Sequence, residues 1–202
     1  MRRLTDSLAS MALTLKCLPT SRMNAIAPSF VVVSNPTSSA NPAVNAAADQ
    51  LGGLDFGIHS IAWAPKEDLH GRVVDSTAEG FNQAVRVSCH SFAEMARLME
   101  PHLSDGGALV TMSYIGADEA VPHYGLMGPV KAALESLVRY MAVELGPRNV
   151  RVHAVSPGPV PTRAASGLLA FDELMTRTAQ TAPLRRLVTL DEIGRCVAFL
   201  VG

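Results

Sequence analysis

Two hydrophobic patterns alternate along most of this chain. Short apolar runs rich in β-branched residues predict strands at 30–33, 54–64, 107–112 and 150–155. Apolar residues at helical spacing, bracketed by Pro, Gly or Thr, predict helices at 41–49, 76–99, 122 or 124 to 145, 171–179 and 191–201. Strands that alternate with helices indicate an α/β fold, in which a doubly wound parallel sheet is covered on both faces.

The first 28 residues do not follow this alternation. Their periodicity is weak and Pro19 and Pro28 interrupt it, so we expect a short helix over about 4–15 at best. We therefore divide the chain into a divergent or poorly ordered segment, 1–28, and an α/β domain, 29–202. The basic and hydroxyl-rich composition of the segment also has some likeness to an organelle transit peptide, which stays open as an alternative. Residues 65–74 read as a loop.

Composition limits the classes of function. A chain of 202 residues is long enough for one domain with a substantial core, and 48% hydrophobic against 17% charged residues are typical of an apolar globular protein. A net charge of −1 gives no argument for a nucleic-acid or membrane-surface partner. Three cysteines without a C-x-x-C pair favour buried thiols in a reducing cytoplasm. No apolar run approaches the ~18 residues of a membrane span.

Tyr124 and Lys131 form the most informative pair in the sequence. If 124–131 is helical, seven residues at 100° each place both side chains on one face, roughly 10 Å apart along the axis. A nearby ammonium favours phenolate and so lowers the pKa of a tyrosine, which would make Tyr124 a usable proton donor. Taken alone, the spacing also occurs by chance, with Lys131 only extending its amine to the solvent.

The position of this pair strengthens its functional reading. Ligands of parallel α/β sheets bind beyond the carboxyl ends of the strands. Three informative segments, 60–64, 113–114 and 157–162, all fall at the carboxyl ends of predicted strands. The sequence therefore predicts one site to which three strand ends contribute.

Other polar residues are weaker candidates. His59 and His90 have no further ligand at metal-binding spacing, so we expect buried, hydrogen-bonded histidines and no metal site. Cys89 lies inside a predicted helix without a paired base, which favours a small buried side chain over a nucleophile. Arg185 and Arg186 could meet an acidic partner or form a solvated turn, and the sequence does not decide between these.

Several motifs between residues 54 and 202 resemble those of the NADH-dependent enoyl-acyl-carrier-protein reductases, a divergent family of the short-chain dehydrogenase/reductase superfamily. The matching blocks are His59-Ser60-Ile61-Ala62-Trp63-Ala64-Pro65-Lys66, Ser88-Cys89-His90-Ser91-Phe92, Thr111-Met112-Ser113-Tyr114, His123-Tyr124 with Met127 to Glu135, and Ser156-Pro157-Gly158-Pro159 with Thr162 to Gly167. Ketoreductases of the superfamily generally have a serine thirteen residues before the tyrosine. Thr111 stands there, and Tyr114 stands ten residues before Tyr124, as in enoyl reductases. A ketoreductase is the weaker alternative.

The resemblance implies hydride transfer from NADH to a trans-2-enoyl thioester carried on acyl carrier protein, in fatty acid biosynthesis, by a cytoplasmic homotetramer. It implies catalytic roles for Tyr114, Tyr124 and Lys131. The implied cofactor-binding residues are Ser60, Ile61, Ala62, Lys131, Pro159, Val160, Thr162, Arg163 and Ala164. The implied substrate-binding residues are Ala64, Met127, Ala165, Leu168 and Phe171. For Met127 and Phe171, ordinary core is the reading that the residues alone favour.

The N-terminal third departs from the family pattern. The family begins with a strand and a glycine-rich turn that holds the pyrophosphate, whereas this chain has no glycine before Gly52. Ser34 stands where the family has an acidic residue, and the final strand and its Asp-Gly-Gly motif are not found. We therefore expect a partial Rossmann-like sheet, truncated at both ends, with the family's fourth, fifth and sixth strands and a remnant of the third at 30–33.

These departures leave a second function open. The chain could be a non-catalytic remnant that associates with a full-length paralogue through the helices 76–99 and 122–145, and a family-type tetramer would lose one interface. Asp172 and Glu173 stand where some relatives have basic residues on the helix that follows the pocket loop, so binding of an acidic carrier protein there is in doubt.

Overall fold

The computed structural model describes residues 30–33, 40–162 and 167–202; the helix expected near 4–15 lies outside them. Its strands are β1 (Phe30–Val33), β2 (Leu54–His59), β3 (Leu103–Met112) and β4 (Arg151–Val155). Its α-helices are α1 (Ala40–Leu51), α2 (Lys66–His70), α3 (Ala78–Val85), α4 (Ser91–Met99), α5 (Met127–Leu145), α6 (Phe171–Thr181) and α7 (Leu190–Val201). A π turn, η2 (Arg86–His90), joins α3 to α4, and short 3₁₀ turns lie at Val73–Asp75, Glu100–His102, Ile115–Ala117 and Gly146–Arg148.

The described strands form one parallel sheet in the order β1-β2-β3-β4. In this register Val33 pairs with His59, His59 with Thr111, and Met112 with Val155. The strands therefore end at almost the same level. The segments that follow them emerge together at one edge, which confirms the prediction that three strand ends meet.

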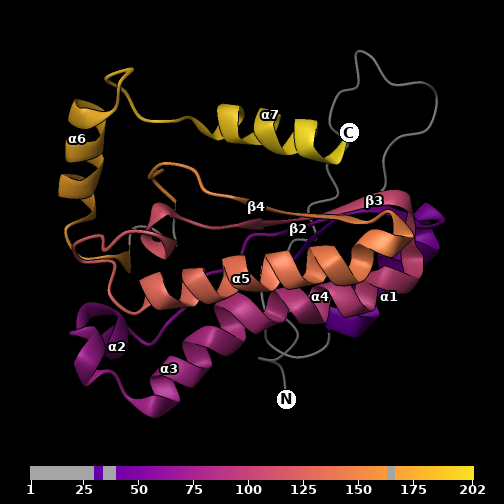
Figure 1. The fold of residues 1–202 in the computed structure, drawn as a ribbon, viewed down its shortest axis with the longest axis horizontal. Helices are drawn as coiled ribbons and strands as arrows, with labels where there is room; N and C mark the ends of the chain where they lie inside the picture. Colours follow the sequence, from indigo (N-terminus) through magenta and orange to yellow (C-terminus); the bar gives the residue numbers. More distant parts are fainter. Residues whose placement is uncertain (1–29, 34–39, 163–166) are drawn as a thin grey trace, which may run out of the picture.

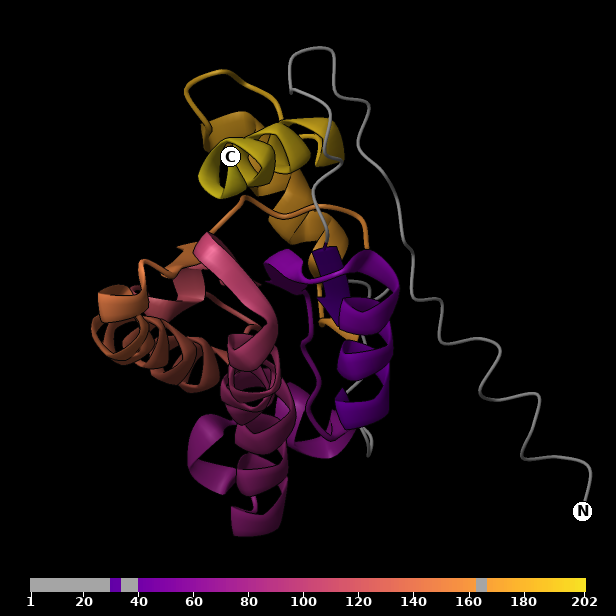
Figure 2. The same ribbon diagram turned by 90° about the vertical axis from the view of Figure 1, so that its right-hand side faces the viewer.

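The helices cover the two faces of this sheet unequally. Figure 1 shows α1, α4 and α5 below the strands and α7 above them, and the end view in Figure 2 shows the same division. Right-handed crossovers place their helices on the same face whenever successive strands are added in one direction. Since β1 to β4 are added in one direction, α1, α4 and α5 share a face, and the chain reaches the other face only after β4.

The strand at 30–33 was expected as a remnant of the family's third strand, and its place in the sheet differs from that expectation. In the usual order 3-2-1-4-5-6, the neighbour of the fourth strand is the first strand. Here β1 pairs directly with β2, the strand that corresponds to the fourth. A twelve-residue helix between them provides the short right-handed crossover that this neighbouring position needs.

Several expected boundaries were wrong: β3 begins at Leu103 and not at 107, and two segments after residue 54 also differ from the expectation. The strand predicted over 54–64 ends at His59, because beyond it the backbone of Trp63 bonds to the side chain of Ser88 and no longer to a neighbouring strand. The loop predicted over 65–74 contains α2. In α2 the Asp68 carboxylate accepts hydrogen bonds from the amide and hydroxyl of Thr77, at 2.6 and 3.2 Å, and a single helical turn is too short to show periodicity.

Most helices lie where the pattern predicts them. The segment 76–99 is helical from Ala78 to Met99, although the π turn within it was not predicted. The helix α7 begins after Thr189, which forms a capping box with Glu192. Among the described residues, no helix is both long and apolar enough to cross a membrane.

Candidate active site

A cavity of about 1250 Å³ lies at the carboxyl ends of the strands. The segments after β2, β3 and β4 line it, together with the first turns of α5, α6 and α7. Thirteen of the residues expected at the site lie in the described part of the chain and line this one cavity: Ser60, Ile61, Ala62, Ala64, Tyr114, Tyr124, Met127, Lys131, Pro159, Val160, Thr162, Leu168 and Phe171. The remaining three, Arg163, Ala164 and Ala165, lie outside the described residues.

Lys131 brings a charge into this largely apolar space. Its side chain is only 4% exposed, and its Nζ donates a hydrogen bond of 2.6 Å to the carbonyl oxygen of Met112, at the end of β3. Burial lowers the pKa of Lys131 to about 8, while Cys89 and Glu135 act in the opposite direction. Near neutral pH the amine is therefore mostly an ammonium, available to hydroxyl or phosphate oxygens.

Tyr124 and Tyr114 lie against each other in the cavity that Lys131 also lines. Their ring centroids are 4.8 Å apart at an interplanar angle of 54°, and Tyr124 is 8% exposed. The sequence predicted that Lys131 would lower the pKa of Tyr124, and this was wrong. Burial, and secondarily Tyr114, raise the pKa of Tyr124 above its usual value. Tyr124 therefore keeps its proton at neutral pH and is available as an O–H donor.

Tyr124 is also not part of the helix that carries Lys131. The helix α5 begins at Met127, three residues later than Tyr124, so the two side chains do not share a helical face. Gly125 has a φ of 51°, in the left-handed region, which interrupts the helix between them. Pro129 then falls in the first turn of α5, where its missing N–H costs nothing.

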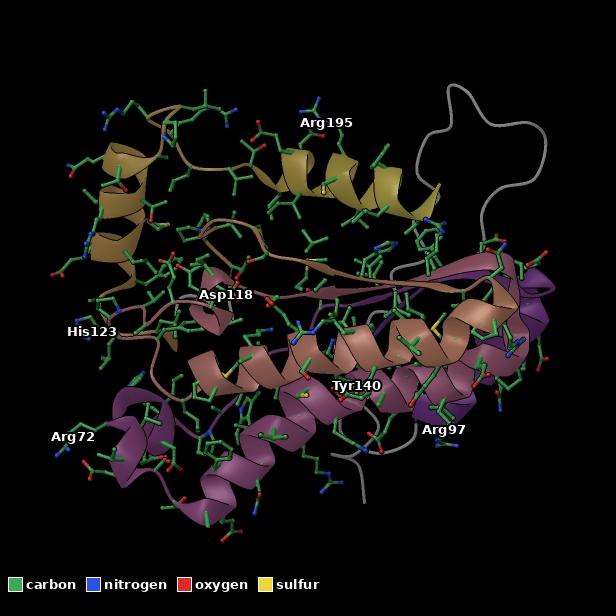
Figure 3. The ribbon with its side chains drawn as sticks, viewed as in Figure 1. Arg72, Arg97, Asp118, His123, Tyr140 and Arg195 are labelled. Atoms are coloured by element: carbon green, nitrogen blue, oxygen red, sulfur yellow. The ribbon has the colours of Figure 1, made fainter. Side chains whose placement is uncertain are left out.

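The turn that leads into α5 fits closely around Tyr124. A Cβ atom added to Gly116 would lie 2.4 Å from the ring of Tyr124, so only glycine fits there. His123 also has a positive φ of 62°, and Figure 3 shows His123 and Asp118 in these turns, at the end of the molecule where α5 begins. The position of Tyr124 is thus set by the turn and not by helix periodicity.

A second tie between β3 and α5 was not predicted. The Ser113 hydroxyl donates to the carboxylate of Glu135, one helical turn beyond Lys131. Consecutive residues at the end of β3, Met112 and Ser113, are thereby bonded to residues 131 and 135 of one helix. The sequence held a signal for this second tie, because Lys131 and Glu135 are four residues apart and therefore share one face of α5.

Several lining residues were missed as site residues. Trp63 stands in the segment after β2, Gln83 and Val87 come from α3 and the π turn, and Leu190 and Ile193 come from α7. Trp63 lies inside a matching motif, which was the available signal. The other four residues line the cavity because α3, the π turn and α7 come near the same strand ends. A local sequence pattern does not predict such contacts between distant elements.

The remaining candidates behave as ordinary structural groups, although His90, which was expected to be buried, is exposed. His59 is fully buried and hydrogen-bonded at both ring nitrogens, and burial, aided by the charge of Lys131, lowers its pKa to about 3. Cys89 is buried, and burial raises the pKa of its thiol. Arg186 is bonded to Glu192 at 2.6 and 2.9 Å, so it presents less free positive charge than its sequence suggests. No group of three metal-ligating side chains occurs among the described residues.

Comparison with known proteins decides the family. The family model described as enoyl-(acyl carrier protein) reductase matches residues 31–202. The chain belongs to this family. Among curated members, it is 40% identical over 168 residues to the enoyl-(acyl-carrier-protein) reductase (NADH) FabI of Rickettsia felis, covering 83% of this chain and 64% of that protein. It is 45% identical over 148 residues to the FabI of Salmonella typhimurium, covering 73% and 56%.

Solved structures of the reductase family agree with the fold. The enoyl-(acyl-carrier-protein) reductase (NADH) of Aquifex aeolicus superposes with a TM-score of 0.76 at 39% identity, over 80% of this chain and 63% of that one. The enzyme from Anaplasma phagocytophilum, solved in complex with NAD, gives 0.75 at 42% identity, over 79% and 61%. The chain thus spans somewhat less than two thirds of the length of these relatives.

Proposed function

We propose that this chain carries the reductase chemistry of its family: reduction of the double bond of a trans-2-enoyl thioester by NADH, with the acyl group borne on acyl carrier protein. The observation that carries the proposal is the joint placement of Tyr114, Tyr124 and Lys131 on one largely apolar cavity at the strand ends. Fatty acid biosynthesis in the cytoplasm is the setting that such a reaction and three cysteines without a C-x-x-C pair favour.

The residues fit the nicotinamide and ribose half of the cofactor. Lys131 supplies a buried ammonium for ribose hydroxyls, and the apolar segment Ser60–Ala62 together with Pro159–Val160 offers surfaces for a flat ring. The pyrophosphate half has no matching glycine-rich turn in the sequence, which has no glycine before Gly52. When bound, NADH supplies the hydride that adds to C3 of the enoyl thioester.

Tyr124 is the group that stabilises the reacting thioester. Hydride addition at C3 moves negative charge to the thioester oxygen, and a buried O–H donor is most effective where charge develops away from water. Its raised pKa keeps Tyr124 protonated for this task. Tyr114 packs against Tyr124 and is the second candidate donor, for protonation at C2.

The apolar part of the cavity suits an acyl chain. Met127, Leu168 and Phe171 line it together with Ala64, and polar side chains are few there. Such a lining selects by size and shape rather than by hydrogen bonds. We assign the acyl group to this end and the cofactor to the end near Lys131.

The test replaces Tyr124 by Phe, which keeps the ring packed against Gly116 and Tyr114 and removes only the hydroxyl. We expect kcat with a crotonyl thioester to fall by about 100-fold, the effect of losing one donor to a developing oxyanion, with the KM for NADH little changed. Tyr140→Phe, on the exposed side of α5, is the control and leaves both constants unchanged. Full activity in Tyr124→Phe would contradict the proposal.

Two other functions make different predictions. A ketoreductase would reduce an acetoacetyl thioester and leave the crotonyl thioester unchanged, whereas we expect the reverse. A non-catalytic remnant would bind no NADH even at about 1 mM, the upper end of usual KM values. The joint placement of the two tyrosines and Lys131 favours the enoyl reductase over both.

We also propose that two copies of the chain associate through the outer sides of α4 and α5, as part of a family-type tetramer. Tyr140 is 70% exposed on α5, and Figure 3 shows it with Arg97 of α4 on the outer side of these helices. Val143, 78% exposed, extends the apolar area of α5. Sedimentation of the wild type and of Val143→Glu tests this, with a loss of assembly expected for the variant.

A further inference from the structure

The π turn η2 contributes Val87 to the wall of the large cavity. It spans Arg86–His90 and interrupts an otherwise continuous helix from Ala78 to Met99. Such turns insert an extra residue into a helix and occur often at functional sites. Ser88 within this turn is fully buried, and Ser91 directly after it is 7% exposed.

Ser88 holds the backbone of Trp63 with both of its hydrogen-bonding functions. The amide of Trp63 donates to the Ser88 hydroxyl oxygen at 2.8 Å, and the Ser88 hydroxyl donates to the carbonyl of Trp63, also at 2.8 Å. The ladder between β2 and β3 ends at the pair His59 and Thr111. Ser88 thus satisfies the two backbone groups of Trp63 that a neighbouring strand would otherwise bond.

Ser91 holds the end of β2, the residue His59 that comes directly before the segment 60–64. Its hydroxyl donates to the carbonyl of Val87 at 2.6 Å, which leaves its oxygen to accept from Nε2 of His59 at 2.8 Å. Nδ1 of His59 then accepts from the Thr111 hydroxyl, at 2.8 Å. A neutral imidazole meets all these bonds, and the end of β2 is held against β3 and α4.

We propose that Ser88 is a positioning residue for the reaction: through the backbone of Trp63 it holds the segment 60–64 in place as the wall of the cofactor and acyl cavity. The inference rests on the proposed function only for its expected effect on the affinity for NADH. All five residues of that segment line the cavity, whereas the Ser88 side chain lies behind it and lines none of it. Ser88 therefore acts through Trp63 and not by touching a ligand.

Trp63 makes this segment observable. It is the single tryptophan of the chain, its side chain is 44% exposed, and it lines the cavity. Its emission therefore reports the position of the wall without any label. NADH bound in the same cavity would also quench this emission by energy transfer.

The experiment compares Ser88→Ala with Cys89→Ala in the full chain. Both remove one buried atom from the π turn, but only Ser88 contacts Trp63. We expect the emission of Ser88→Ala to shift to longer wavelength, since the released wall exposes the indole further to water. We also expect its affinity for NADH to fall about tenfold, because two backbone groups lose their partner. Cys89→Ala keeps the wild-type emission and affinity.

Ser88→Cys provides a second variant that keeps the shape of the side chain. A thiol is a weak donor and acceptor, so its emission and NADH affinity fall between those of the wild type and Ser88→Ala. This variant decides the matter if Ser88→Ala does not fold. Emission and affinity in both Ser88 variants equal to those of Cys89→Ala would overturn the proposal.

The design separates this inference from the proposed function. Trp63 emission is measured without NADH, so it tests the hold of Ser88 on the wall by itself. A wild-type chain that binds no NADH would refute the proposed function. In that case the change in Trp63 emission would still support or overturn the inference that Ser88 holds the segment 60–64 in place.

Discussion

The sheet face covered by α1, α4 and α5 and the face covered by α7 differ greatly in how much apolar surface they bury. On the first face, one continuous cluster of described side chains runs from Val44 of α1 through Phe92 of α4 to Leu134 of α5. On the second, the buried cluster among the described residues consists of Val110, Val155 and Val197. The first face should therefore supply most of the free energy of folding, since that energy follows the apolar area removed from water.

The same comparison explains where the site is built. The described side chains that hold or form the reacting centre, Ser88, Ser91, Tyr124 and Lys131, come from the helices and turns of the well-packed face. The α7 face contributes apolar lining such as Leu190 and Ile193. Groups that must keep their positions stand on the rigid side, and the other side closes the cavity.

The most direct way to break this comparison is a matched pair of leucine truncations. Leu134 on α5 is fully buried, whereas Leu200 on α7 is only partly buried. We expect Leu134→Ala to reduce the free energy of unfolding by about 3–4 kcal/mol, and Leu200→Ala by about 1 kcal/mol. Urea unfolding followed by circular dichroism measures both. Equal losses would mean that the two faces are equally important.

The alternation of hydrophobic patterns was sufficient to predict the fold class and the meeting of three strand ends. It did not predict the place of β1, because sheet order depends on which crossover the chain takes and not on local pattern. It also placed Tyr124 in the helix of Lys131, since Gly125 was not read as a residue with positive φ. The hydrogen bonds from Ser88 to Trp63 and from Ser113 to Glu135 join residues 25 and 22 positions apart, beyond any periodicity.

The second prediction concerns the buried charge of Lys131. Its pKa is about 8 in the folded chain, against a usual value of 10.5, so between these values the unfolded chain binds more protons. The contribution of Lys131 to the free energy of unfolding therefore rises with pH, by about 1–2 kcal/mol between pH 8 and 9.5. Urea unfolding across this range measures the rise.

The control for this pH dependence is Lys131→Met, which keeps a long side chain without a titrating group. Its free energy of unfolding should not rise from pH 8 to 9.5; it should fall slightly, because burial raises the pKa of the Cys89 thiol and the folded chain then binds more protons than the unfolded one. A rise of the same size in Lys131→Met would assign the effect to other groups. Of those that interact with Lys131, His59 titrates far below this range, and burial raises the pKa of Cys89. Cys89→Ala, combined with Lys131→Met, therefore removes the opposing contribution of the thiol, and the free energy of unfolding of this double variant should hardly change over the range.

The smallest expected effect is at the cap of α7. The Thr189 hydroxyl accepts from the amide of Glu192 at 3.2 Å, and the Glu192 carboxylate accepts from the amide of Thr189 at 2.9 Å. Thr189→Ala should cost about 1 kcal/mol, the usual loss for an N-cap residue. Thr176→Ala, in the exposed part of α6, should cost almost nothing. A loss of several kcal/mol at Thr189 would show that α7 carries more of the stability than its small cluster suggests.

The central question is whether the cavity formed by the strand ends and α5 binds NADH. Titrating the purified 202-residue chain with NADH, while following the emission of Trp63 and of the cofactor, tests this directly. We predict saturable quenching of Trp63 with enhanced NADH emission, half-complete below about 1 mM, and a large loss of affinity in Lys131→Met. No saturable change at that concentration, or equal binding by Lys131→Met, would contradict the assignment of this cavity as the cofactor site.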